Sequence, residues 1–368
     1  MVRTMSLLRA LISTARMVRH TPRLADGLPP DGEVLLDAPD DRLGPALVAA
    51  ALGDHGPAAK LLATTRETAE WENRDRYVTR LAAFAYGRGD WLDDWLATAP
   101  GDADALLVRA ELAMRRAWES PARAERLREV GPLIEAAAEA GPRDPVPWRL
   151  ALDHARGTHA THTTFESLWE QAVRRSSHHF GAHVAALQYL SAVCCARWGD
   201  TPHTPGDSHR ECFDFAERAA EDALPGSLVQ ALPVRAAFDR LLTGGPGSVA
   251  ADRVDAAADR AIALSAAYRP TDPWPAEVRN LLVYVLIARG RWAEALEQFR
   301  LTGPYATSFP WSCLTDDPLG RFLEARDGVR IEIAASMPLR PARQSFLNRP
   351  NRANRGRAGQ SRSGGHYA

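Results

Sequence analysis

Helical periodicity runs through nearly the whole chain, and this feature most constrains what the chain can fold into. Apolar residues recur every three or four positions, whereas the strict alternation typical of a half-buried strand is almost absent. The one candidate strand, residues 329–333 (Val-Arg-Ile-Glu-Ile), has no obvious partner. Because an isolated strand leaves its backbone groups unpaired, we interpret this segment as helix or extended linker. The sequence therefore predicts an all-α protein.

The predicted helices come in pairs that meet at short glycine turns. A helix over residues 43–51 ends at Gly53, a helix over 71–86 ends at Gly89, and a third turn lies at Gly290. Glycine there supplies the left-handed backbone conformation that ends one helix and lets an antiparallel neighbour begin. The spacing from Gly53 to Gly89 is close to the length of a two-helix repeat. Further helices are predicted over residues 122–140, 165–175, 180–197, 209–223, 227–242, 248–267 and 277–289.

The segment around the third glycine turn resembles the tetratricopeptide repeat. The resemblance rests on apolar, turn and aromatic positions, namely Leu282, Leu286, Gly290, Trp292, Ala295 and Phe299. Arg279 stands where the family has a tryptophan, and the terminal proline is displaced to Pro304. Residues 198–200, 213–216, 309–311 and 317–319 look like a group of bacterial helical-repeat proteins with no known activity. The resemblance implies an α-solenoid, a right-handed superhelix of about fourteen helices stacked as antiparallel pairs.

Composition divides the chain into four segments. We expect an amphipathic helix and linker over residues 1–39, the helical-repeat domain over 40–326, a short linker over 327–337 and a tail over 338–368. The tail holds seven arginines, no acidic residue and few apolar groups, so we expect it to be disordered. Residues 1–337 then carry a net charge of −8. Near the N-terminus, an apolar helical face predicts a packing segment or, less favoured, a membrane-surface helix; it comprises Leu8, Leu11, Ile12, Ala15 and Val18.

The sequence lacks the motifs of the common enzyme classes. Lys60 is the only lysine and has no glycine-rich loop around it, which excludes a phosphate-binding loop. The chain has no Gly-x-Ser-x-Gly, His-Glu-x-x-His or Cys-x-x-Cys motif, and no apolar run long enough to span a membrane. The glycines at 244–247 could hold an anion, but an inter-helix loop explains them as well. We therefore predict a cytoplasmic, non-enzymatic protein without a cofactor.

A solenoid binds partners on its concave surface, through an extended peptide or a helix. Aromatic and arginine side chains make good anchors for such a partner, although core packing is the commoner role of a tryptophan. On this basis the predicted partner-binding residues are Trp148, Arg149, His183, Tyr189 and Trp198.

Two other functions stay open. Histidines and cysteines concentrate between residues 154 and 212, and a zinc site could use His209 and Cys212 with the Cys194–Cys195 pair. Against this, thiols in an apolar helix usually act as small buried hydrophobic groups. The arginine tail could bind nucleic-acid phosphates, but Phe346 and Tyr367 are its only aromatic residues for base stacking.

Overall fold

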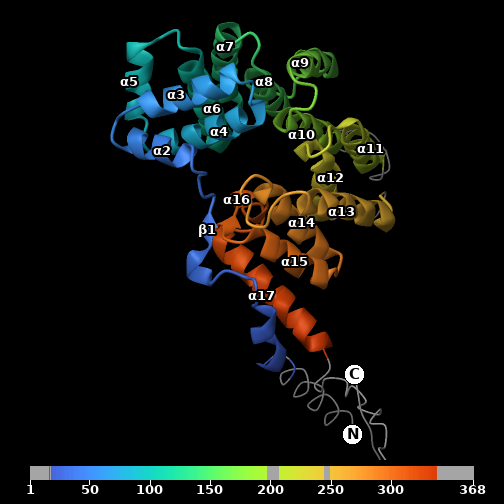
Figure 1. Cartoon of the computed structure of the whole chain (residues 1–368). Helices are drawn as coiled ribbons and strands as arrows, with labels where there is room; N and C mark the ends of the chain where they lie inside the picture. The colour runs from blue at the N-terminus through green and yellow to red at the C-terminus, as the bar shows by residue number, and fades with distance from the viewer. Residues whose placement is uncertain (1–15, 17, 197–206, 244–248, 338–368) are drawn as a thin grey trace, which may run out of the picture.

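The computed structural model describes residues 16, 18–196, 207–243 and 249–337. These residues are helical apart from connecting loops and one pair of two-residue strands (Figure 1). The predicted all-α class is thus confirmed. The N-terminal half contains η1 (Asp31–Glu33), β1 (Leu35–Leu36), α2 (Leu43–Ala51), α3 (Gly56–Glu67), α4 (Trp71–Gly87), α5 (Asp90–Thr98), α6 (Ala103–Glu119), α7 (Arg123–Ala140), α8 (Val146–Gly157), α9 (His162–Arg175) and α10 (Phe180–Ala196). The C-terminal half contains α11 (Asp207–Asp222), η3 (Leu228–Ala231), α12 (Leu232–Thr243), α13 (Ala251–Ala266), α14 (Ala276–Ala288), α15 (Trp292–Thr302), β2 (Tyr305–Ala306), α16 (Ser308–Trp311) and α17 (Pro318–Ser336).

Most helices pack against the next one along the chain, and alternate helices also touch. Contacts of this second kind run from α4 through α6, α8, α10 and α12 to α14. The sequence of α4 shows why, since Tyr77, Val78, Leu81, Ala82 and Ala85 form one buried stripe at helical spacing. Helix α10 also contacts α4 directly, so this row of alternate helices curls back toward its own beginning.

Residues 18–40 pack on the C-terminal half of the molecule. Leu24 and Val34 belong to the same apolar cluster as Trp311. Strand β1 pairs in parallel with β2, with Leu35 opposite Tyr305. Figure 1 shows this blue segment beside the red helix α17. A two-residue pairing between positions 35 and 305 leaves no periodic signal in the sequence.

Several local expectations can be compared with the backbone. Gly53 and Gly290 have φ values of +87° and +70°, which confirms the left-handed turns predicted there. At Gly89 the prediction is wrong: φ is −90°, and the residue caps α5 from a right-handed conformation. Of the two interpretations of residues 329–333, helix is confirmed and extended linker is not, because α17 continues to Ser336 and buries Val329 and Ala334; the linker expected over 327–337 is therefore not found. The tail over 338–368 and the glycines at 244–247 lie outside the described residues.

Candidate functional site

A central cleft of about 440 Å³ lies where the two halves of the molecule face each other. Its walls come from α4 between Glu72 and Ala83, the start of α10, the start of α14, residues 37–43 and residues 305–309. Both kinds of side chain line it: aromatic and aliphatic groups such as Phe180 and Trp274, and charged groups such as Glu72, Arg76 and Arg115. Ligand sites commonly combine an apolar wall with a few placed polar groups.

The first half of α4 holds the parts around the cleft together. Its segment Arg74-Asp75-Arg76-Tyr77 sends four consecutive side chains to four different places, and this is possible because successive helical residues point about 100° apart. Arg74 and Asp75 pair with groups of the N-terminal half, Arg76 reaches Trp274, and the Tyr77 hydroxyl donates to Asp40 Oδ2 at 2.7 Å. The cleft is therefore positioned by α4.

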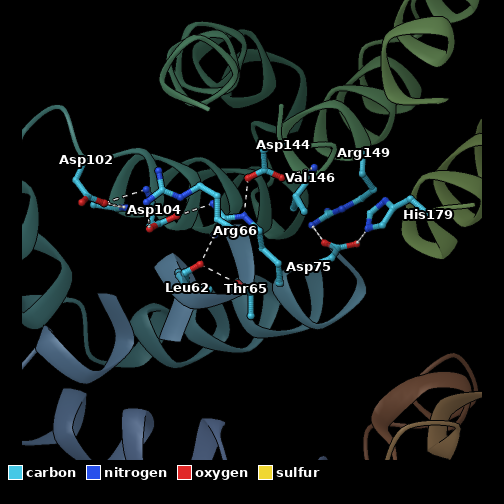
Figure 2. Close-up of polar contacts among 12 residues, drawn as sticks. Leu62, Thr65, Arg66, Asp75, Asp102, Asp104, Asp144, Val146, Arg149 and His179 are labelled. Carbon is cyan, nitrogen blue, oxygen red and sulfur yellow. Dashed lines mark hydrogen bonds and ion pairs between the residues drawn. The ribbon is translucent and has the colours of Figure 1, made fainter. Parts of the chain in front are cut away.

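Arg74 is the centre of a buried ionic network, and Figure 2 labels its partners Leu62, Asp104 and Asp144. Its guanidinium donates to Asp144 Oδ2 at 2.5 Å, to Asp104 Oδ1 at 2.6 Å and to the Leu62 carbonyl at 2.9 Å. Arg66 approaches the other oxygen of Asp104 at 3.3 Å. Three helices and the loop before α8 thus meet at one charge-compensated arginine.

Arg149 forms the second network and links three of the alternate helices. Its guanidinium contacts Asp75 of α4 at 2.5 Å, Glu111 of α6 at 2.8 Å and Asp153 of its own helix at 3.4 Å. Burial lowers the pKa of Arg149, but these three carboxylates outweigh it and raise that pKa above its ordinary value. Arg149 is therefore held as a cation inside the protein.

His179 sits on the far side of Asp75, as Figure 2 shows. Its Nε2 lies 3.5 Å from Asp75 Oδ2, and its Nδ1 accepts the Ala182 amide at 3.3 Å. An accepting Nδ1 assigns the proton to Nε2, so the imidazole N–H points at the carboxylate. Gly181 makes the approach possible, since a Cβ there would meet Asp75 Oδ2 at 2.1 Å. Asp75 thus accepts a hydrogen bond from Arg149, and the His179 Nε2 lies near its other oxygen without a hydrogen bond.

Two arginines of α4 also bind residues that line the cleft. The Arg76 guanidinium lies 4.2 Å from the centre of the Trp274 ring, and Nη2 donates to the Trp274 carbonyl at 2.6 Å. Arg80 donates to Asp37 Oδ1 at 2.7 Å, and Asp37 accepts the amide and hydroxyl of Ser308. Burial raises the pKa of Asp37, yet Arg80 and Ser308 outweigh it and hold this pKa below its usual value. These contacts join α4 to the C-terminal half on two sides.

Glu72 is a carboxylate of the cleft without an arginine partner among its described contacts. One oxygen accepts the Phe180 amide at 2.7 Å. Burial raises the pKa of Glu72 above its ordinary 4.5, and the nearby Asp75 adds to the rise. Burial also lowers the pKa of Arg76. The cleft therefore contains charged groups of both signs that an entering ligand could neutralise.

The predicted partner-binding residues occupy other places. Arg149, His183 and Tyr189 are 7%, 5% and 2% exposed, so they are packed and do not line an open groove. The His183 Nδ1 lies 2.9 Å from the His179 carbonyl, and Tyr189 stacks on Phe165 with ring centres 4.0 Å apart. These three positions depart from the prediction because their polar atoms have internal partners.

The two tryptophans of that set differ from the other three. Trp148 is partly buried and lies under the Arg175 guanidinium at 4.4 Å, away from the central cleft. Trp198 lies outside the described residues. Of the four predicted residues that the structure describes, none lines the central cleft.

The described residues contain no group of three or more His, Cys, Asp and Glu side chains placed to hold a metal ion. His209 and Cys212 are both buried on α11, as their spacing on one helix face predicts. The side chains of Cys194 and Cys195 lie outside the described part, as does His203.

Sequence reasoning missed the cleft residues Glu72, Arg76 and Trp274. Their signal is a run of charged residues beside aromatic ones at the start of α4, Trp-Glu-Asn-Arg-Asp-Arg-Tyr over 71–77. Two of its four charged residues have internal partners of opposite charge, because Arg74 belongs to the buried network and Asp75 forms an ion pair with Arg149. The charged residues of a solvated helix face have no such partners. Their partners lie more than a hundred residues away, at 180 and 274, and no local spacing reveals them.

No family model matches the chain, and no curated protein or solved structure matches it. The resemblance of residues 282–299 to the tetratricopeptide repeat therefore stays a prediction. Among the described helices, none is both long and apolar enough to cross a membrane.

Proposed function

We propose that this chain is a non-enzymatic scaffold that binds a short, extended segment of a partner protein in the central cleft. The alternate helices α4, α6, α8, α10, α12 and α14 would form the inner layer of an α-solenoid, and the intervening helices its outer layer. Two observations support this reading: the inner helices contact one another in order, and α10 returns to touch α4.

The observation that carries the proposal is the composition of the cleft on this inner layer. It offers about 440 Å³, aromatic walls and charged groups of both signs. That volume is in the range of ligand pockets, roughly 300–1,000 Å³, and suits a few side chains rather than a whole helix. Aromatic and arginine side chains are also the usual anchors of protein interfaces.

The most strongly held charged groups next to the cleft favour binding over catalysis. Arg74, Arg149 and Asp75 are engaged by internal partners at 2.5–2.8 Å. Groups fixed in this way shape a site and set its electrostatic potential, while Glu72, Arg76 and Arg115 line the cleft, Glu72 and Arg76 through contacts with Phe180 and Trp274. This division supports the scaffold function.

The test is a selection from a random peptide library against the full-length chain. Ala83 lines the cleft on α4, whereas Ala263 is exposed on α13, so Ala83→Trp and Ala263→Trp make the same substitution inside and outside the cleft. We expect selected peptides to bind the natural chain and Ala263→Trp equally, and to lose about tenfold or more in affinity for Ala83→Trp. Equal affinity for all three proteins, or no selected peptide, would contradict the proposal.

A further inference from the structure

Most charged side chains of the central cleft have a partner within the protein. Four acidic residues that line it each contact another side chain, namely Asp37 with Arg80, Asp40 with Tyr77, Asp75 with Arg149 and Glu277 with Arg235. Of the arginines, Arg80 pairs with Asp37 and Arg76 lies over the Trp274 ring. Glu72 and Arg115 are the only charged residues of the lining for which the described part of the chain supplies no partner side chain.

Glu72 lies at one end of the cleft, on the first turn of α4. Its Oε1 accepts the Phe180 amide at 2.7 Å, and its Oε2 accepts nothing from the described residues. His179 and Arg76 attract this carboxylate, but neither forms an ion pair with it. The rings of Phe180 and Trp274 line the same cleft. A carboxylate oxygen with aromatic walls suits an ammonium or guanidinium group, which is attracted both to the charge and to a ring face.

Arg115 lies toward the other end of α4. Arg74 near the start of α4 donates to Asp104 near the start of α6 at 2.6 Å. Arg116 near the end of α6 lies 5.9 Å from the centre of the Tyr86 ring, near the end of α4. The two helices therefore run parallel, and Arg115 lies beside the last turns of α4. Its Nε is buried without a hydrogen-bond partner, so this guanidinium can gain a charge-assisted hydrogen bond from an entering carboxylate.

The face of α4 that lines the cleft sets the distance between these two charges. Glu72, Arg76, Thr79 and Ala83 follow one another along it at helical spacing. With a rise of about 1.5 Å per helical residue, the stretch from Glu72 to Ala83 is about 16 Å long. An extended chain covers about 3.3 Å per residue, so about five residues of a partner span this length.

We propose that the partner segment carries one basic and one acidic side chain about five residues apart, and that Glu72 binds the basic one and Arg115 the acidic one, an inference that rests on the proposed function. One unpaired charge of each sign at opposite ends fixes the direction in which the segment lies. A segment with two acidic or two basic residues at these positions is rejected, because it places like charges together at one end.

The first test is the composition of the peptides that the full-length chain selects. The library contains random peptides of about nine residues with acetylated and amidated ends, so that no terminal charge competes. We expect the selected peptides to share a Lys or Arg and an Asp or Glu about five positions apart, and to bind less tightly as salt is added. Peptides that lose affinity for Ala83→Trp but lack this pair would overturn the inference and leave the proposed function standing. A selection without any binder would overturn both.

The second test removes one charge of the cleft at a time. Glu72→Gln keeps an oxygen for the Phe180 amide, and Arg115→Gln keeps a polar side chain. We expect each to lose about tenfold in affinity for a selected peptide, with circular dichroism unchanged. The matched controls Glu67→Gln on α3 and Arg109→Gln on α6 change exposed residues outside the cleft and should bind as the natural chain does. A control that loses as much affinity as its cleft variant would contradict the proposal.

Changes in the peptide then assign each charge to its partner without altering the protein. Replacing the peptide's basic residue by Gln should weaken binding to the natural chain about tenfold and cause little further loss in Glu72→Gln. Replacing its acidic residue should behave in the same way with Arg115→Gln. In addition, Arg115→Glu should bind a peptide whose acidic residue is changed to Lys better than it binds the original peptide. Losses that simply add in both pairs would overturn the assignment.

Discussion

The two halves of the molecule bury their helices by different means. In the N-terminal half the apolar side chains form three separate clusters, while the C-terminal half has one continuous cluster that extends from α10 to α17. Aromatic rings run through the second in edge-to-face contact, as in the pair Trp311 and Phe322. Ionic networks around Arg74 and Arg149 bridge the separate clusters of the first.

Buried arginines show the same difference. Arg149 in the N-terminal half contacts three carboxylates, whereas Arg279 in the C-terminal half donates to backbone carbonyls and to the Ser265 hydroxyl. Removing Arg149 leaves carboxylates without a counter-charge, whereas removing Arg279 leaves only uncharged carbonyl and hydroxyl groups without a donor. Two arginines of similar burial therefore stabilise the protein differently, one by ion pairs and the other by hydrogen bonds to uncharged groups. The pH dependence of the free energy of unfolding distinguishes the two.

The largest effect is expected for Arg149→Met. The substitution leaves Asp75, Glu111 and Asp153 close together without a counter-charge, and breaking a buried ion pair in this way costs about 3–5 kcal/mol. The free energy of unfolding, measured with urea at about pH 7 and about pH 4, is the readout. Because the three carboxylates can take up protons in the folded variant, its loss should shrink as pH falls through the ordinary carboxyl range. A loss that is equal at both pH values would contradict the ionic mechanism.

Arg279→Met is the matched change in the C-terminal half. It removes donors to the carbonyls of Ser265, Arg269 and Leu301, and unsatisfied buried polar groups cost about 1–3 kcal/mol. Those carbonyls do not titrate, so the loss should be the same at about pH 7 and about pH 4. The same urea unfolding experiment measures it. A loss that shrinks at acid pH, as for Arg149→Met, would break the comparison between the halves.

Gly181→Ala tests the close approach of Asp75 to α10. A Cβ at position 181 would lie 2.1 Å from Asp75 Oδ2, so the carboxylate must move away from Arg149 and His179. We expect a loss of about 1–3 kcal/mol in the free energy of unfolding. In the double variant with Arg149→Met, the loss in the free energy of unfolding should be smaller than the sum of the two single losses, because both substitutions disrupt the same network.

Gly328→Ala is the control for this glycine substitution. Position 328 is inside α17, and a Cβ there meets nothing within 4 Å. Alanine is the better helix former, so this variant should gain about 0.5–1 kcal/mol. A loss in Gly328→Ala similar to that of Gly181→Ala would show that the effect is not specific to Asp75.

Periodicity in the sequence was enough to predict the all-α class, but it did not predict that residues 18–40 pack on the C-terminal half. The helix over residues 71–86 and the left-handed Gly53 and Gly290 are local features, and these were predicted correctly. The contact of residues 18–40 with the C-terminal half combines one short strand pair, Arg326 donating to the Pro29 carbonyl, and burial of Leu24 and Val34 in the apolar cluster of Trp311. Such contacts over long sequence separations leave no repeating pattern.

The candidate site was predicted less well, and Arg149 shows why. Its neighbour Trp148 suggested an exposed anchor, but its counter-charges Asp75 and Glu111 lie 74 and 38 residues earlier. Burial of an arginine depends on those distant carboxylates, which a helical pattern does not reveal. The same holds for Glu72, whose partner is the amide of Phe180.

The smallest effect is expected for Glu72→Gln, which compares Glu72 with the arginine-paired carboxylates of the same N-terminal half. Glu72 is half-buried, and the described residues give it no hydrogen bond or ion pair with an arginine; partial burial raises its pKa above 4.5, although His179 and Arg76 oppose the rise. A carboxyl group whose pKa is raised on folding destabilises the folded state once pH exceeds its unfolded pKa, and this penalty disappears as pH falls below that value. Glu72→Gln keeps an oxygen for the Phe180 amide and removes the charge. We therefore expect the variant to be more stable than the natural chain at about pH 7, by about 1 kcal/mol or less, with the difference vanishing at about pH 4. Urea unfolding at both pH values measures this, and a destabilised variant at about pH 7 would show that the attraction of His179 and Arg76 for the Glu72 carboxylate outweighs the penalty of burial.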